Sequence, residues 1–254
     1  MPKPRVVLFD IGSTLWSSPA EDPGALESCY SRGRQVLIDA LGDAPDVQSL
    51  VEAVEGYFAE WEEIWRHDAS IITQAPTTEF VATALANLRL HPPPDALAAF
   101  TDAILQVSVG TAVVEPPEPG MPEALAGLRE LGLRLGCVSN AFMGASTLHQ
   151  IMVERRLGEH LELTISSCEF GYRKPHPSIY EAAVERMGVA TNEIIFVGDR
   201  VEQDVVGPAK LGMRTVLTLQ YREEDPTRSP VKPDAVIKHL KELPDIAKAM
   251  LDGR

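Results

Sequence analysis

The chain has 254 residues, of which 44% are hydrophobic and 24% charged, and its formal net charge is −14. This length and apolar content are sufficient for one large domain or for a core with an insert. The acidic balance repels nucleic-acid phosphates and anionic lipid, so we expect neither nucleic acid nor a membrane surface as a partner, whereas a divalent cation would be attracted.

The three cysteines are scattered along the chain and have no CxxC spacing: Cys29, Cys137 and Cys168. Such a set is typical of reduced thiols in a cytoplasmic protein and not of a disulfide framework or a zinc site. No long apolar segment follows the first residues, and no run of eighteen uninterrupted apolar residues occurs. We therefore expect neither secretion nor a membrane span, and we predict a cytoplasmic location.

The first predicted element is a buried strand over Val6–Asp10, a short apolar run that ends in a carboxylate. Runs of this kind are typical of parallel strands that are covered on both faces. Gly12, Ser13 and Thr14 break the run, which places Asp10 at the carboxyl end of a central strand. Open α/β sheets bind ligands at that edge. An aspartate there can attack an electrophile, bind a metal or only cap the next turn.

The next ninety or so residues show helical spacing of apolar residues and no convincing strand. An all-helical insert after the first strand suggests a helical cap domain over the active edge of the sheet, and we assign residues 16–113 to it. An aromatic stripe in the second predicted helix is interpreted as core and not as a ligand site. The predicted helices cover 23–41, 47–67, 78–88 and 95–107.

A regular alternation of helices and strands follows a proline-rich turn at 115–120. Alternating βα units imply a parallel, doubly wound sheet, so residues 1–15 and 114–254 are predicted to form an α/β core. The charged, proline-rich segment 221–234 is interpreted as a surface loop. Helices are predicted at 121–131, 145–157, 177–187, 203–211 and from 238, and strands at 133–139, 163–166, 194–197, 214–217 and 235–237.

Polar residues follow the predicted strands of the core where a purely structural strand needs none. Ser139 and Asn140 end the second strand, Lys174 precedes a proline-led helix, and Asp199 and Asp204 lie five positions apart around a strand-to-helix turn. Each has an ordinary explanation, such as a helix cap, a solvated surface charge or a charge at a helix start. Taken singly, these residues do not decide a function.

Their kind and order are more specific. The chain resembles the haloacid dehalogenase superfamily in four motifs that follow one another in order. They are an aspartate on the first strand, a serine on the next sheet strand, a lysine before a proline-led helix, and Gly-Asp-x-x-x-x-Asp. The helical insert lies where the C1-type cap of this superfamily lies. The resemblance extends from Asp10 to Asp204 and implies a hydrolase with a Rossmann-like core and an inserted cap, but it leaves the substrate open.

Within this superfamily, the resemblance implies a Mg²⁺-dependent phosphatase of a small phosphorylated molecule. Asp10 would attack phosphorus and form an aspartyl-phosphate. A carboxylate that faces a phosphate dianion needs a neutralising cation, and Mg²⁺ prefers carboxylate oxygens. The implied metal positions are Asp10, Gly12 through its backbone carbonyl, Asp199 and Asp204. The implied phosphate-binding and charge-stabilising positions are Ser139, Asn140 and Lys174.

Gly12 departs from the pattern of the superfamily's phosphatases, which usually carry a second aspartate two residues after the nucleophile. That aspartate protonates the leaving alkoxide and later deprotonates the attacking water, and such help contributes about 10²–10⁴-fold. A phosphatase without it should favour aryl or acyl phosphates or take an acid from the cap. The cap candidates are Glu62, Glu63, His67 and Asp68.

Two other functions stay open at this point. A 2-haloacid dehalogenase-type hydrolase also lacks the second aspartate, although that branch usually has an aromatic residue at the Gly12 position and does not need the Gly-Asp-x-x-x-x-Asp element. A catalytically impaired protein would bind phosphate and metal without turnover. The phosphonate-cleaving branch uses a cap lysine and is excluded, because no lysine lies between Lys3 and Lys174. Candidate carboxylate- and halide-binding residues of a dehalogenase are Arg32, Arg34 and Arg66.

Overall fold

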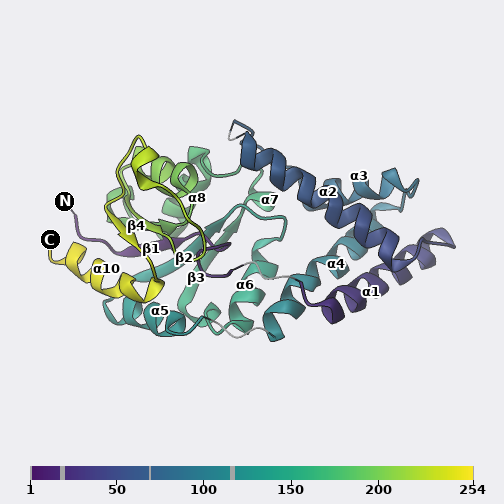
Figure 1. Ribbon diagram of the computed structural model, residues 1–254, viewed down its shortest axis with the longest axis horizontal. Coiled ribbons are helices and arrows are strands. Elements are labelled where there is room, and N and C mark those ends of the chain that lie inside the picture. Colours follow the sequence, from purple (N-terminus) through teal and green to yellow (C-terminus); the bar gives the residue numbers. More distant parts are fainter. Residues whose placement is uncertain (1, 18–20, 69, 115–117, 254) are drawn as a thin grey trace. The chain divides into compact units, whose positions relative to one another are not determined.

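The computed structural model describes residues 2–17, 21–68, 70–114 and 118–253 (Figure 1). The chain divides into two compact units, one formed by Met1–Pro19 with Pro116–Arg254 and the other by Ala20–Glu115. The first contains a β-sheet with helices and is called the α/β unit below. The described residues of the second form helices linked by short turns, and it is called the helical unit. That residues 16–113 form a cap stays a prediction.

The α/β unit is built on six parallel strands in the order β3-β2-β1-β4-β5-β6. The strands are β1 (Val6–Phe9), β2 (Arg134–Ser139), β3 (Leu161–Ser166), β4 (Ile194–Gly198), β5 (Arg214–Thr218) and β6 (Ala235–Ile237). β1 lies between β2 and β4, with Phe9 opposite Cys137 and Val197. The predicted parallel, doubly wound fold is confirmed, and the carboxyl ends of β1, β2 and β4 meet at one edge.

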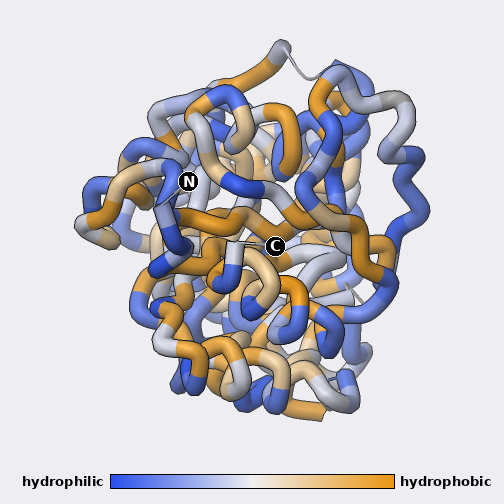
Figure 2. The backbone as a smooth tube through the Cα atoms, turned by 90° about the vertical axis from the view of Figure 1, so that its left-hand side faces the viewer, coloured by the Kyte–Doolittle hydropathy of each residue, from blue (hydrophilic) through white to orange (hydrophobic). Residues whose placement is uncertain are grey.

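Helices cover the sheet on both faces: Figure 1 shows α8 on one side and α5 and α10 on the other. The helices are α5 (Met121–Glu130), α6 (Ala145–Glu154), α7 (Ser167–Phe170), α8 (Pro177–Met187), α9 (Gly207–Lys210) and α10 (Leu243–Leu251). Short 3₁₀ turns lie at Gly158–His160, Thr191–Glu193, Pro226–Arg228 and Leu240–Glu242. This double cover explains why all four residues of β1 are apolar and fully buried. Figure 2 shows these hydrophobic strands in the interior, with hydrophilic segments around them.

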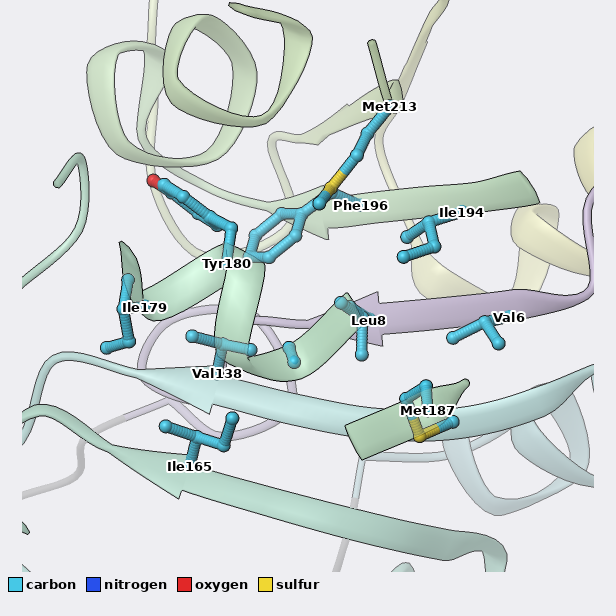
Figure 3. Packing of buried hydrophobic residues seen from close by; sticks show 11 residues of the cluster. Val6, Leu8, Val138, Ile165, Ile179, Tyr180, Met187, Ile194, Phe196 and Met213 are labelled. Atoms are coloured by element: carbon cyan, nitrogen blue, oxygen red, sulfur yellow. The ribbon is translucent and has the colours of Figure 1, made fainter. Parts of the chain in front are cut away.

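The core between α8 and the sheet also fixes the turn that follows β4 (Figure 3). Tyr180 of α8 lies edge-on to Phe196 of β4, with ring centroids 5.5 Å apart. Its hydroxyl donates a hydrogen bond to the backbone carbonyl of Gln203. A Cβ atom at Gly207 would clash with the same tyrosine, so glycine is needed for this close approach. The predicted helix 203–211 is in fact a π-helical turn, η3 (Val201–Val206), followed by α9.

The helical unit contains α1 (Pro23–Leu41), α2 (Val47–His67), α3 (Thr77–Asn87) and α4 (Pro94–Val114). The predicted bounds of the first two helices are confirmed, and their start signals are visible. The carboxylates of Asp22 and Asp46 each accept an N–H three residues later at 2.8 Å. Gly42 ends α1 with a φ of 85°, a left-handed conformation that glycine adopts without strain.

The helix α4 continues seven residues beyond its predicted end at Val107. Gly110, a poor helix former, lies inside this extension and allows α1 to approach. A Cβ atom there would lie 2.7 Å from the Cβ atom of Ala25. Close packing of two helices has therefore overridden local propensity. By length and composition α4 is also the one helix of the described chain that could cross a membrane, which is weak support for a span because buried core helices pass the same test.

The aromatic stripe of α2 is only partly core. Phe58 and Trp65 are buried, as interpreted from the sequence. Tyr57 and Trp61 are half-buried and, with Phe80 of α3, line a pocket of about 270 Å³ within the helical unit. The free thiols of Cys29, Cys137 and Cys168 are all buried.

We expect Glu55 to make the helical unit less stable as the pH rises. Glu55 on α2 accepts a hydrogen bond from the buried hydroxyl of Tyr30 on α1. Burial, reinforced by Glu21 and Glu62, raises the pKa of Glu55 from its ordinary value of 4.5 to about 7 although this hydrogen bond opposes the rise. Between these two values the unfolded chain releases the proton and the folded chain retains it. Unfolding therefore becomes easier across this range, and stability levels off above the folded pKa.

The measurement is a set of thermal melts at pH 5 and pH 8. From pH 5 to pH 8 the melting temperature should fall less in Glu55→Gln than in the parent protein. For a chain of this size, the two decreases should differ by roughly 5 °C. Glu60→Gln removes the same charge from an exposed position on the same helix and should retain the parental pH dependence. Equal losses in all three proteins would show that Glu55 ionises normally in the folded chain.

Candidate active site

The loop after β1 holds Asp10 at the carboxyl edge of the sheet. The N–H of Asp10 donates to the Val197 carbonyl at 2.9 Å, which extends the pairing with β4 to this residue. The chain then turns sharply, because the N–H groups of Leu15 and Trp16 both donate to the carbonyl of Ile11, at 2.9 and 3.0 Å. Asp10 itself is 8% exposed.

Lys174 joins Asp10 to Asp204. Its ammonium group lies 2.7 Å from Oδ1 of each carboxylate, and the lysine side chain is completely buried. Burial by itself would lower the pKa of Lys174, but the two carboxylates outweigh that effect and raise it. The lysine is therefore a permanent positive charge between residues that are 164 and 30 positions away in the chain.

Asn140 fixes the backbone that carries this lysine. Its side-chain amide donates to the Lys174 carbonyl at 3.0 Å and accepts the Lys174 N–H at 2.8 Å. The same amide nitrogen also donates to Oε1 of Gln203 at 3.3 Å. The donors of this predicted phosphate-binding side chain are thus used within the protein, which leaves its backbone N–H for a ligand. Ser139, the last residue of β2, is buried beside it at the same edge.

Asp199 and Asp204 are placed by the end of β4 and by η3. The Asp204 Oδ2 atom accepts the N–H of Arg200 at 3.0 Å, and the Asp204 N–H donates to the Arg200 carbonyl at 2.7 Å. Both aspartates are almost completely buried. A π-helical turn is uncommon and is frequently found at functional sites; here it turns Asp204 back toward Lys174.

We predict that Gly198→Ala damages this arrangement. A Cβ atom at Gly198 would clash with the Asp204 side chain, so Asp204 must move away from Lys174. We expect a loss of about 1–3 kcal/mol in the free energy of unfolding and a smaller rise of the melting temperature with Mg²⁺. Thermal melts with and without Mg²⁺ measure both. Gly12→Ala is the control, because a Cβ atom there meets nothing within 4 Å; identical behaviour of the two variants would refute the steric argument.

The three aspartates fit a divalent cation. Asp10, Asp199 and Asp204 each offer an oxygen, and these atoms lie within 4.8 Å of one another. Asp199 Oδ1 is buried and has no hydrogen-bond partner among the residues that the structure describes. Burial, with Asp10 and Asp199 adding repulsion, raises the pKa of Asp204 to about 7 against the attraction of Lys174. When all three carboxylates are ionised, they outnumber their two ion-pair partners, Lys174 and Arg222, and their hard oxygen donors suit Mg²⁺.

Comparison with known proteins identifies the family of this chain. A sequence model of a hydrolase family, described as haloacid dehalogenase-like hydrolase, matches residues 4–212. The chain belongs to the haloacid dehalogenase-like hydrolases. It is 27% identical over 253 residues to a glyceraldehyde 3-phosphate phosphatase of Methanopyrus kandleri, across 97% of this chain and 98% of that protein. A second protein of that name, from Methanocaldococcus jannaschii, is 35% identical over 134 residues, which are 52% of this chain and 57% of the other.

A solved structure of a 2-haloacid dehalogenase from Pseudomonas syringae is also similar. Its TM-score is 0.63 at 20% sequence identity, and the match covers 96% of this chain and 98% of that chain. At this identity the likeness shows the shared fold and does not extend to the reaction. The predicted membership of the superfamily and the predicted enzyme class, a hydrolase, are thus confirmed.

Sequence reasoning missed Arg222 in this hydrolase. Its Nε atom forms an ion pair with Oδ2 of Asp199, and it comes from the segment 221–234 that was interpreted as a surface loop. The sequence contains no signal for this contact, because Arg222 is one of several charges in a polar segment without periodicity. Only the pairing of β5 with β4 brings the start of that segment to the edge that holds Asp199.

The predicted cap residues belong to the helical unit. Within that unit they have local partners: Glu63 pairs with Arg66 and with His67, the latter at 2.6 Å. The Asp68 carboxylate accepts the N–H of Ser70 at 2.9 Å. Arg34, a dehalogenase candidate, donates to the carbonyl oxygens of Pro45 and Ala44 at 2.6 and 3.1 Å. Arg32 donates to the Ser28 hydroxyl at 2.9 Å, and Glu62 is exposed on α2.

Proposed function

We propose that this hydrolase is a Mg²⁺-dependent phosphatase that releases phosphate from a small phosphorylated molecule through an aspartyl-phosphate on Asp10. The observation that supports it most is the buried cluster of Asp10, Lys174, Asp199 and Asp204, in which a fixed ammonium bridges two carboxylates and the third keeps an oxygen without a hydrogen bond. A relative that is named as a phosphatase, and that this chain matches over 98% of the relative's length, supports the same reaction class.

In this proposal the nucleophile is Oδ2 of Asp10, because Lys174 holds Oδ1. The oxygen attacks phosphorus, and the bond from phosphorus to the leaving oxygen breaks. Lys174, the Ser139 hydroxyl and the backbone N–H of Asn140 bind the phosphate oxygens and stabilise the charge that they carry during transfer. Asp10, Asp199, the Gly12 carbonyl and Asp204 would hold Mg²⁺, which supplies electrostatic neutralisation of the phosphate dianion.

The absence of a side chain at Gly12 determines which substrates react. The leaving oxygen departs without a proton donor at that position, so leaving groups of low pKa, such as aryl and acyl phosphates, should react faster than alkyl phosphates. The water that hydrolyses the aspartyl-phosphate also has no base there, and the covalent intermediate should therefore accumulate. We further propose that the helical unit is a C1-type cap that covers the reaction and excludes water.

The test is release of phosphate from an aryl phosphate with Mg²⁺ and with a chelator, run beside chloride release from 2-chloropropionate. The proposal expects metal-dependent phosphate release, no chloride release, and loss of the Mg²⁺ response in the double variant Asp199→Asn/Asp204→Asn. Asp245→Asn, at an exposed position on α10, should behave as the parent protein. Chloride release without metal would assign the chain to the dehalogenases. Binding of metal and phosphate without turnover of any phosphate ester would make it a binding protein.

A further inference from the structure

Arg222 is paired with a carboxylate that the proposed metal site uses. Asp199 accepts from the guanidinium Nε through Oδ2, while its Oδ1 atom is buried without a hydrogen-bond partner. The Asp199 side chain is 1% exposed and that of Arg222 is 33% exposed. The arginine thus reaches from the protein surface to the buried group and keeps part of its side chain in water.

The charges at this edge explain why the pair forms. Three carboxylates face the single ammonium of Lys174 and the guanidinium of Arg222. Without Arg222, Asp199 would be a buried carboxylate that forms no ion pair with any other described residue, which is strongly unfavourable. Arg222 therefore stabilises the ionised form of Asp199 while no metal is bound.

A divalent cation changes this balance. Two positive charges arriving among Asp10, Asp199 and Asp204 repel a guanidinium that contacts one of the same carboxylates, and the repulsion is large in a poorly solvated site. With Lys174 and a divalent cation in place, the three carboxylates are fully neutralised and Arg222 would add an unbalanced charge. Binding of the metal and retention of the Arg222–Asp199 pair therefore oppose each other.

The backbone around Arg222 allows this side chain to move away from Asp199. Up to position 220 the backbone is fixed, because the Leu219 N–H donates to the Ile237 carbonyl at 2.9 Å and the Gln220 side chain accepts the Leu240 N–H at 2.7 Å. From 221 to 225 the chain lies outside helices and strands. A swing of Arg222 toward solvent therefore breaks neither a sheet nor a helix hydrogen bond.

We propose that Arg222 is a displaceable counter-ion: it pairs with Asp199 in the metal-free enzyme and moves away from Asp199 when Mg²⁺ binds. It is a positioning residue that weakens Mg²⁺ binding and couples the segment 221–225 to the metal. This inference rests on the proposed Mg²⁺ site, and the experiment distinguishes failure of the inference from failure of the proposed metal site.

The experiment is titration of the full chain with Mg²⁺ alone by calorimetry, with thermal melts of the metal-free proteins. Arg222→Gln and Arg222→Ala should bind Mg²⁺ more tightly than the parent, on the order of tenfold, and should melt at a lower temperature without metal. Arg222→Lys, which keeps the charge, should restore most of the parental affinity. Lys232→Gln, which removes a charge from an exposed position ten residues after Arg222, should change neither quantity. In the parent protein, Mg²⁺ should accelerate hydrogen exchange of the amides at 221–225.

The possible failures are separable. If the parent protein and the Arg222 variants all fail to bind Mg²⁺, the proposed metal site itself is wrong. If the parent binds Mg²⁺ and the two neutral variants bind it equally or more weakly, Arg222 only supports the local structure and the displacement is refuted. Slower exchange at 221–225 on addition of Mg²⁺ would also refute it, because the metal would then be ordering this segment and not releasing it.

Discussion

Asp10→Asn should lower phosphate release by at least about 10³-fold, because an amide oxygen is a far weaker nucleophile than a carboxylate. The melting temperature should stay near that of the parent protein. The substitution keeps the shape of the side chain, relieves repulsion with Asp199 and Asp204, and leaves Lys174 paired with Asp204 at 2.7 Å. Steady-state kinetics on an aryl phosphate, with a melt of each protein, measure both quantities.

The two readouts separate a chemical role of Asp10 from a structural one. Lost turnover with an unchanged melt assigns Asp10 to the reaction. A large fall in the melting temperature would mean that the carboxylate mainly holds Lys174 in the core. Turnover within a few-fold of the parent would show that another group attacks the substrate. Asp245→Asn serves as the control for the removal of one aspartate charge.

Gly12→Asp should raise the turnover of alkyl phosphates, by about 10²-fold at the lower limit of general acid–base help. The position has room, because a Cβ atom at Gly12 meets nothing within 4 Å in the structure. The new carboxyl group would protonate the leaving alkoxide and then assist the water that hydrolyses the intermediate. Aryl phosphates should gain much less, because their leaving groups depart without a proton.

Two matched substitutions isolate the proton transfer. Gly12→Asn has the size of aspartate without its acid, and Gly12→Ala adds only the Cβ atom; neither should gain activity. If Gly12→Asp accelerates alkyl and aryl phosphates equally, the carboxylate acts on something other than the leaving group. If it accelerates neither, an acid from elsewhere in the protein already performs this step.

Local sequence signals were sufficient for most of the fold. The continuous apolar run at Val6 predicted a strand covered on both faces, and the caps at Asp22 and Asp46 set the starts of α1 and α2 where they were predicted. Helix α4 extends seven residues beyond its predicted end, and the packing of Gly110 in this extension against Ala25 is a tertiary effect that a sequence window does not contain. The π-helical turn at 201–206 was missed for a similar reason, since its geometry depends on Tyr180 from another helix.

For the candidate site, too, the sequence indicated which residues are present but not which of them contact each other. Strand ends indicated Asp10 and Asp199, because parallel strands deliver their carboxyl ends to one edge, and the order of the motifs along the chain added Lys174 and Asp204. The partnerships within the site could not be predicted in this way. That Asn140 uses both atoms of its amide on the Lys174 backbone, and that Arg222 pairs with Asp199, follows from contacts between residues 34 and 23 positions apart.

The most direct test of the account is the mass of the peptide that contains Asp10 after an acid-quenched reaction with an aryl phosphate and Mg²⁺. We expect a phosphoryl group on Asp10, which accumulates because Gly12 provides no base for its hydrolysis, and less of it in Gly12→Asp. An unmodified peptide in an enzyme that releases phosphate would contradict the aspartyl-phosphate mechanism. An alkyl ester on the same residue after incubation with 2-chloropropionate would instead assign Asp10 to carbon–halogen cleavage.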